Sequence, residues 1–219
     1  MSMGVRLALL GDSIAAGRGA QHRTQTPGAQ LARRLLDDGV DVTSRVFAVP
    51  GALSAQLAVQ VDRTLPWHPH VAVIIIGAND LIHHTRAGRA ARNLGDAVRR
   101  LRDVGAEVVV APAPDLSALP DTPPGLKHVL HAASMVLRDT QITAAIAAGA
   151  RVADRDHATS AVFAADRELF CGDRFHPSSA GYSVIVDTLL PLVHTAISAR
   201  EDACEAPLRA VDGASRVEV

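Results

Sequence analysis

Five short apolar runs alternate with longer segments of helical periodicity, and this alternation strongly constrains the fold. The runs cover residues 5–10, 42–49, 71–76, 108–111 and 151–153. Their near-continuous apolar character is typical of strands that are buried on both faces of a parallel sheet. Strand alternating with helix predicts an α/β protein: a three-layer α/β/α, doubly wound, five-stranded parallel sheet with the flavodoxin-like strand order.

The length and the apolar content predict one domain. The chain has 219 residues, 48% of them apolar, which is enough for one substantial core of the size that single α/β domains commonly reach. We expect the domain to span residues 1–199, with long helices over 126–149 and 178–197. Residues 200–219 mix charged, small and proline residues with little periodicity, so we expect a poorly ordered tail there.

Charge and composition argue against several classes of partner. The formal net charge is −1, so no global field favours nucleic acid or an anionic membrane. No run approaches the roughly 20 apolar residues of a membrane span, and the apolar stretch at the N-terminus is shorter than a secretory signal requires. Two cysteines, Cys171 and Cys204, fit a reducing compartment. We therefore expect a soluble, cytoplasmic protein, and the sequence leaves its oligomeric state open.

One glycine and several polar residues that could take part in a reaction lie directly after the predicted strands or before the last predicted helix. Ser13 comes after the first apolar run, Gly51 after the second and Asn79 after the third, while Asp173 and His176 precede the last predicted helix. Ligands of open parallel sheets bind beyond the carboxyl ends of the strands. We expect these five residues to gather at that edge, although 160 positions separate Ser13 from Asp173.

Three of these residues have the properties of a nucleophile, a base and an orienting carboxylate. An alkyl hydroxyl such as that of Ser13 is a poor nucleophile at neutral pH and needs a base, which His176 can supply. Asp173 lies three residues before His176, close enough in a turn to fix the tautomer and the orientation of the imidazole. Asp115 and Asp154 also end strand-like runs and are less favoured alternatives for orienting His176.

The remaining groups fit the stabilisation of a developing oxyanion. Asn79 carries an amide NH₂, Gly51 lets its backbone approach a substrate closely, and the backbone N–H of Ser13 is a third candidate donor. Asp12 and Asp80 stand next to these residues. We expect both to hold their loops through hydrogen bonds from side chain to backbone and to take no part in the chemistry.

The motifs, taken in this order, resemble those of the SGNH hydrolases, also called GDSL-type esterases and lipases. They are Gly11-Asp12-Ser13-Ile14, Val49-Pro50-Gly51-Ala52, Gly77-Ala78-Asn79-Asp80 and Asp173-x-x-His176-Pro177. The resemblance covers residues 5 to about 195. It implies that Ser13 is the nucleophile, that Asp173 and His176 complete a catalytic triad, and that Ser13, Gly51 and Asn79 form the oxyanion hole. It also implies hydrolysis of esters or thioesters without a cofactor.

Two positions depart from the family's pattern. Ile14 stands where the family name has leucine, and Val46-Phe47-Ala48 replaces an asparagine that is often found a few residues before the second-block glycine. The second difference concerns the local turn geometry before Gly51.

Other catalytic and cofactor motifs do not fit. The nucleophile elbow of the common α/β-hydrolases has the pattern G-x-S-x-G, and here Ala15 occupies the position of the second glycine. The chain has neither a dinucleotide-binding G-x-G-x-x-G nor a phosphate-binding G-x-x-x-x-G-K-[ST] pattern, and it has no zinc-like Cys/His spacing. We expect no cofactor and no metal.

The function expected from these observations is that of a serine esterase acting on small acyl esters or thioesters. An acyltransferase that passes the same acyl group to a sugar or another alcohol is an alternative, and a catalytically silent binding module is a less favoured one. Six aromatic residues offer little material for stacking on sugars.

The apolar residues beside the motifs are candidates for an acyl pocket or for the core: Leu53, Leu81, Phe170 and Phe175. His83 and His84 are expected to be exposed loop residues.

Overall fold

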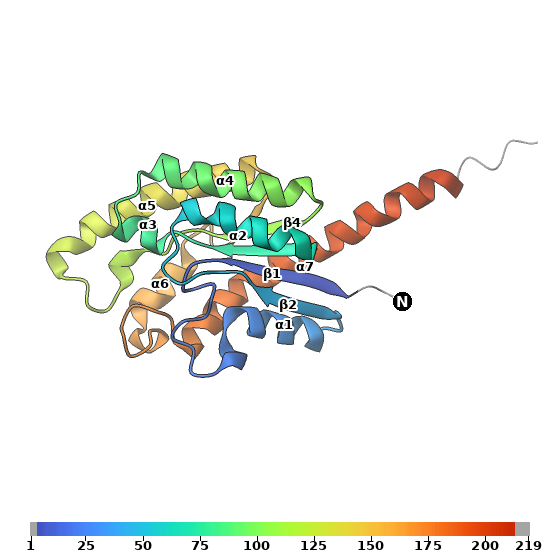
Figure 1. The fold of residues 1–219 in the computed structure, drawn as a ribbon. Coiled ribbons are helices and arrows are strands. Elements are labelled where there is room, and N and C mark those ends of the chain that lie inside the picture. The colour runs from blue at the N-terminus through green and yellow to red at the C-terminus, as the bar shows by residue number, and fades with distance from the viewer. Residues whose placement is uncertain (1–3, 213–219) are drawn as a thin grey trace, which may run out of the picture.

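The computed structural model describes the backbone of residues 4–212 and the side chains of residues 4–202. Within this range five parallel strands form one sheet with the order β2-β1-β3-β4-β5 (Figure 1). The strands are β1 (Val5–Gly11), β2 (Val42–Val46), β3 (Val71–Ile75), β4 (Glu107–Ala111) and β5 (Arg151–Val152). This is the flavodoxin-like order that the sequence predicts.

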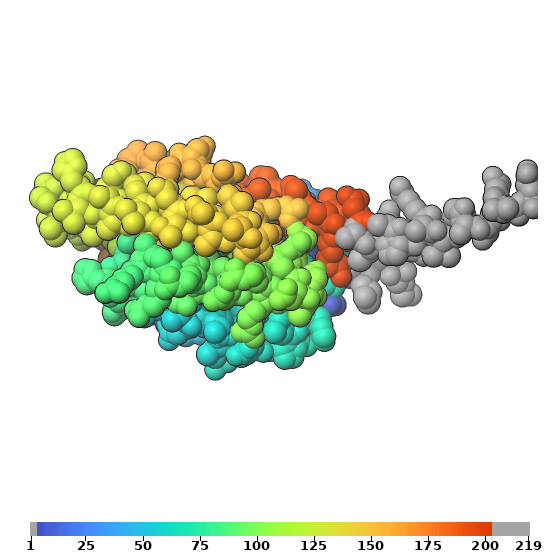
Figure 2. All heavy atoms as spheres, turned by 90° about the horizontal axis from the view of Figure 1, so that it is seen from above, coloured from blue at the N-terminus to red at the C-terminus, as the bar shows by residue number. Residues whose placement is uncertain are grey.

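Helices cover both faces of the sheet and complete the three layers. They are α1 (Pro27–Asp37), α2 (Leu57–Thr64), α3 (Ala78–Ile82), α4 (Ala87–Asp103), α5 (Pro124–Ala147), α6 (Ala158–Ala165) and α7 (Ser179–Asp212). One core cluster joins α1 and α7 to the sheet, and the other joins α2, α4 and α5 to the opposite face (Figure 1). Figure 2 shows α4 in green and α5 in yellow packed side by side along this second layer.

The central strands have the burial that the apolar runs predict, whereas the edge strands do not. Leu9 of β1 is fully buried and pairs with Val73 of β3, which is fully buried as well. At one edge, β2 ends at Val46 and is partly exposed, so the predicted run 42–49 is too long for the strand. Phe47 continues beside β1, with its N–H donating to the Leu9 carbonyl at 2.7 Å. The edge position exposes one side of a strand that the sequence pattern treats as fully buried.

The last helix is longer than the sequence predicts. The pattern places its end at position 197, but the backbone of α7 stays helical as far as Asp212. The order of the predicted tail 200–219 stays a prediction. The extension contains several alanine, glutamate and arginine residues, which favour helix. Residues 213–219 lie outside the described part of the chain, and a domain boundary at 199 remains a prediction.

One segment of α7 is long and apolar enough to cross a membrane, contrary to the expectation that no run approaches such a span. It lies within Ser179–Asp202, and an 18-residue stretch of that segment has a mean hydropathy of 1.4. Its apolar side chains Tyr182, Val186, Leu189 and Val193 are fully buried in the core cluster on the α1 side of the sheet. Packing in the domain core therefore accounts for the apolar composition of this helix.

Candidate active site

Ser13 lies in a tight turn directly after β1. Gly11 has φ +132°, and a β-carbon there would lie 1.8 Å from the Ile75 carbonyl oxygen, so only glycine lets β1 end so close to β3. Ser13 and the residues after it form successive turns. The N–H of Arg18 donates to the Ser13 carbonyl at 2.9 Å, which closes the loop below the serine.

Two buried side chains that sequence reasoning missed hold this turn in place. Gln60 of α2 is 1% exposed; its Oε1 accepts from the N–H of Gly11 at 2.7 Å and its Nε2 donates to the Gly11 carbonyl at 2.8 Å. Tyr182 of α7 donates its hydroxyl to the Arg18 carbonyl at 2.5 Å. A polar residue on the apolar face of α2 was the available signal for Gln60.

The structure brings Ser13, His176 and Asp173 into one hydrogen-bonded chain. His176 Nε2 lies 2.9 Å from Ser13 Oγ, and His176 Nδ1 lies 2.6 Å from Asp173 Oδ2. Ser13 is 5% exposed and His176 is 7% exposed, so both lie in a largely desolvated site. The two ring nitrogens of one imidazole thus face a hydroxyl and a carboxylate, which is the contact pattern of a nucleophile, a base and an orienting acid.

The loop that carries Asp173 and His176 is held by the aspartate itself. Asp173 Oδ1 accepts from the backbone N–H groups of Phe175 and His176, both at 2.9 Å, and from the thiol of Cys171 at 3.1 Å. Partial burial would raise the pKa of Asp173, but the hydrogen bonds from the backbone N–H and the ring of His176, from Cys171 and from Phe175 hold it well below its usual range. Asp173 is therefore ionised across the neutral range. No sequence motif indicates the contact from Cys171.

The alternative carboxylates lie elsewhere. Asp115 Oδ2 contacts the ring of His131 at 2.7 Å, and Asp154 Oδ2 accepts from the guanidinium of Arg138 at 2.8 Å. Each is engaged with a side chain of α5. Asp173 is therefore the carboxylate that contacts His176.

The candidate oxyanion donors come from the loops that follow β1, β2 and β3. The backbone N–H of Ser13 donates to no acceptor within residues 4–202, and the exposed turn at Gly51 has φ +82°, a conformation that favours glycine. The amide of Asn79, in the first turn of α3, donates to the carbonyl of Ala52 at 3.1 Å. This bond places the side chain of Asn79 against the loop that carries Gly51.

Asp12 is a buried carboxyl directly before the candidate nucleophile. It is 1% exposed, and its Oδ1 accepts from the N–H of Ile14 at 2.9 Å, which is the loop-holding contact expected from the sequence. Its Oδ2 has no hydrogen-bond partner among the described residues. Burial raises the pKa of Asp12 to about 7; the N–H groups of Ile14 and Gly77 oppose this shift, and the charge of Asp80 adds to it.

The raised pKa of Asp12 predicts a loss of stability as the pH rises. Between about pH 4 and pH 7 the unfolded chain releases this proton while the folded chain keeps it, so the free energy of unfolding falls by up to about 4 kcal/mol. Asp12→Asn carries no ionisable group at this position, so its free energy of unfolding should fall less as the pH rises. Urea unfolding of the wild type and the variant at pH 5 and pH 8 measures the difference. Equal pH dependence of the unfolding free energy in both proteins would contradict the raised pKa of Asp12.

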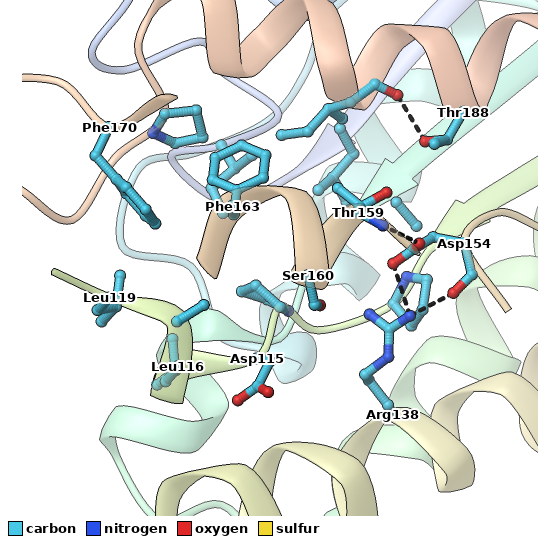
Figure 3. A pocket seen from close by; sticks show the side chains of 18 of the residues that line it. Asp115, Leu116, Leu119, Arg138, Asp154, Thr159, Ser160, Phe163, Phe170 and Thr188 are labelled. Carbon is cyan, nitrogen blue, oxygen red and sulfur yellow. Dashed lines mark hydrogen bonds and ion pairs between the residues drawn. The ribbon is translucent and has the colours of Figure 1, made fainter. Parts of the chain in front are cut away.

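A deep apolar pocket opens beside the triad (Figure 3). It lies between the segment after β4, α6, α7 and the loop that carries Asp173, and it measures about 760 Å³ with its open mouth included. Ile14, Phe175 and Pro177, which are chain neighbours of Ser13 and His176, form the wall nearest the triad. The ring of Phe175 also packs edge-on against the ring of His176, with centroids 4.9 Å apart.

The pocket contains two of the four residues that the sequence suggests for it. Phe170 and Phe175 line it. Leu116, Leu119 and Phe163 line it as well, and Figure 3 labels these three together with Phe170. Leu53 and Leu81 lie outside the pocket, because Leu53 belongs to the loop after β2 and Leu81 to α3. The proline-containing segment after β4 supplies one wall of the pocket.

The other predicted features of the site are placed as follows. His83 and His84 are exposed at the end of α3. Among the described residues, no group of three His, Cys, Asp or Glu side chains is arranged to hold a metal ion.

Comparison with known proteins places this chain in a family. The model of the GDSL-like Lipase/Acylhydrolase family matches residues 9–184, a range that includes Ser13, Gly51, Asn79, Asp173 and His176. The chain belongs to this family. Family membership agrees with the resemblance of the motifs to the SGNH hydrolases and with the fold.

Individual relatives agree with this family. The GDSL-like esterase Rv1075c of Mycobacterium tuberculosis is 36% identical over 202 residues, which are 90% of this chain and 64% of that protein. The chain thus spans somewhat less than two thirds of the length of this curated relative. Among solved structures, TesA superposes with a TM-score of 0.72 at 21% identity, covering 87% of this chain and 99% of TesA. The psychrotrophic esterase EstA from Pseudoalteromonas sp. has a TM-score of 0.67 at 17% identity, with 87% and 97% covered, and both structures share the fold.

Proposed function

We propose that this protein is a serine esterase that hydrolyses small acyl esters through an acyl-enzyme on Ser13. The observation that carries the proposal is the chain of contacts from Ser13 Oγ to His176 Nε2 at 2.9 Å and from His176 Nδ1 to Asp173 at 2.6 Å. Membership of a lipase and acylhydrolase family supports the same chemistry. The related GDSL-like esterase of Mycobacterium tuberculosis supports the reaction class.

The proposed reaction proceeds in two halves. Ser13 Oγ attacks the acyl carbonyl carbon while its proton passes to His176 Nε2, and the tetrahedral intermediate collapses as His176 returns the proton to the departing alcohol oxygen. Water then attacks the acyl carbon and gives a proton to His176. Collapse of the second intermediate releases the acid, and Ser13 Oγ recovers its proton. The ionised Asp173 keeps Nδ1 protonated and stabilises the imidazolium that forms twice in the cycle.

The proposed oxyanion hole consists of the backbone N–H groups of Ser13 and Gly51 and the side-chain amide of Asn79. Donors that are held in place before the reaction begins stabilise the negative oxygen without further reorganisation, and the bond to Ala52 holds the Asn79 side chain in this way. Removal of one such donor costs about 10²–10³ in turnover in comparable sites. We expect Asn79→Ala to lower kcat by about this factor with a much smaller change in KM. Steady-state kinetics check it, and an unchanged kcat would remove Asn79 from the proposed hole.

We propose that the pocket beside Phe175 binds the acyl chain. Its walls are mainly apolar and its nearest wall lies next to the triad, so an acyl chain bound there would lose contact with water as it extends. Each buried methylene contributes about 0.8 kcal/mol, which is about fourfold in kcat/KM. A series of p-nitrophenyl esters from acetate upwards should show a rise of this size per methylene until the pocket is full.

A bulky side chain in the pocket tests where the acyl chain lies. Leu119→Trp should lower kcat/KM for the longer esters and leave acetate turnover within about twofold, because only longer chains reach that wall. The matched control is Leu126→Trp on α5, where the leucine is 52% exposed and outside the pocket lining. The same chain-length profile in wild type and Leu119→Trp would place the acyl chain elsewhere.

The reaction product separates hydrolysis from acyl transfer. The purified protein is incubated with p-nitrophenyl butyrate, with and without glycerol or glucose, and the acyl products are identified by mass spectrometry. The proposal predicts free butyric acid as the main product in both mixtures. Acylated alcohol as the main product would identify a transferase, and no release of p-nitrophenol at any ester length would contradict an acyl-enzyme function altogether.

A further inference from the structure

The loop that carries Gly51 and the short helix that carries Asn79 are joined by a buried carboxylate. Asp80, which follows Asn79, is fully buried, and its Oδ2 accepts from the backbone N–H of Ser54 at 2.9 Å. Its Oδ1 accepts from the hydroxyl of Ser54 at 2.9 Å. Ser54 is fully buried and lies three residues after Gly51. Both oxygens of the carboxylate are thus directed at one residue of the neighbouring loop.

A third bond closes this arrangement on the side of the reaction centre. The Asn79 amide donates to the carbonyl of Ala52 at 3.1 Å, so consecutive residues of α3 bond to the same short loop. Asn79 is only partly buried, whereas Asp80 and Ser54 lie beneath it out of contact with water. Hydrogen bonds to an acidic side chain in such surroundings hold their geometry tightly, since an unpaired oxygen there is costly.

We infer that Asp80, through its paired hydrogen bonds to Ser54, is the positioning residue that sets the spacing between the Gly51 N–H and the Asn79 amide. The inference rests on the proposed function, because these two groups are donors of the proposed oxyanion hole. Asp80 touches neither substrate nor reacting atoms. It acts by fixing two donors that belong to different loops, and a shift of about 1 Å in such groups can cost about 10²-fold in rate.

The inference predicts a selective loss of transition-state stabilisation. Ser54→Ala removes the hydroxyl bond to Asp80 and keeps the backbone bond, so kcat per active site should fall about tenfold while KM stays within about twofold. Asp80→Asn can make both contacts with Ser54 through its oxygen and its NH₂, and should retain most of the activity that Asp80→Ala loses. The inhibition constant of an alkylboronic acid, whose tetrahedral adduct mimics the intermediate, should rise together with the loss of kcat.

The experiment separates positioning from mere folding. Active sites are counted by titration with a fluorophosphonate, so that kcat refers only to competent protein. The control is Thr64→Val, which removes another fully buried hydroxyl, one that donates to the Gln60 carbonyl at 2.8 Å; it should lower the melting temperature and leave kcat per site unchanged.

If Ser54→Ala and Asp80→Ala keep wild-type kcat per site, or if Asp80→Ala fails to fold and Ser54→Ala alone keeps it, the inference is wrong. That outcome leaves the proposed function standing as long as Ser13→Ala is inactive. Loss of kcat in Thr64→Val equal to that in Ser54→Ala would likewise overturn the positioning role.

Discussion

Ser13→Ala should lower kcat for p-nitrophenyl butyrate by about 10⁴-fold or more, because the variant lacks the oxygen that forms the acyl bond. The remaining rate would come from the oxyanion donors and from substrate binding alone. The fold should persist, since the only side-chain contact of the Ser13 hydroxyl within the described residues is the 2.9 Å bond to His176. We expect the free energy of unfolding to change by less than about 1.5 kcal/mol.

The control for Ser13→Ala removes a comparable hydroxyl away from the site. Ser183 on α7 has its Oγ 2.9 Å from the side-chain oxygen of Gln30, and Ser183→Ala should keep wild-type kcat within about twofold. Initial rates and urea unfolding of the three proteins make the comparison. Ser13→Ala turnover equal to that of Ser183→Ala would show that Ser13 is not the nucleophile.

Asp173→Asn should lower kcat by about 10⁴-fold, the size of effect known for this change in a triad of the same geometry. The side-chain NH₂ of the asparagine would donate a hydrogen bond to Nδ1 of His176. The ring proton would then reside on Nε2, which could no longer accept a proton from Ser13. The side chain of Asp173 is 42% exposed, so the variant should fold. Steady-state kinetics above pH 6, where the wild-type carboxylate is fully ionised, give the measurement.

A second histidine–aspartate contact provides the comparison for Asp173→Asn. His194 Nε2 lies 2.9 Å from Asp38 Oδ2 on the surface of the α1 and α7 layer, and Asp38→Asn should leave kcat unchanged. If Asp173→Asn lost less than about tenfold, the contact at 2.6 Å would not be orienting a catalytic base.

The order of the sheet was predictable because it depends on the alternation of apolar runs with segments of helical periodicity, and each of these patterns extends over a whole strand or helix. The apolar runs that became β1 and β3 are buried strands, as their lack of alternation indicates, apart from the first two residues of β1. The same reasoning overestimated the burial of β2, because an apolar run does not say whether a strand lies at an edge. The extension of α7 to Asp212 was not predicted, because the sequence after position 200 lacks the apolar periodicity by which a helix is recognised.

The candidate site was predictable where motifs named the residues and unpredictable where the fold alone supplies contacts. Proximity of Ser13 and His176 follows from the rule that the carboxyl ends of parallel strands share one edge. Gln60 and Tyr182 support the site from elements with no motif of their own, and their hydrogen bonds to Gly11 and Arg18 depend on packing between distant segments. Cys171 lies two residues before Asp173, and the local turn of that loop brings its thiol to the carboxylate. Leu53 and Leu81 show the opposite error, since closeness in sequence to a motif does not place a side chain in the pocket.

The most direct test of the account is covalent labelling by a fluorophosphonate followed by peptide mapping. Such reagents phosphonylate a serine that a neighbouring base activates, and the adduct is stable enough to locate by mass spectrometry. The account predicts one adduct per chain, on Ser13, with labelling slowed by orders of magnitude in His176→Ala. Absence of labelling in folded wild-type protein, or an adduct on a different serine, would contradict it.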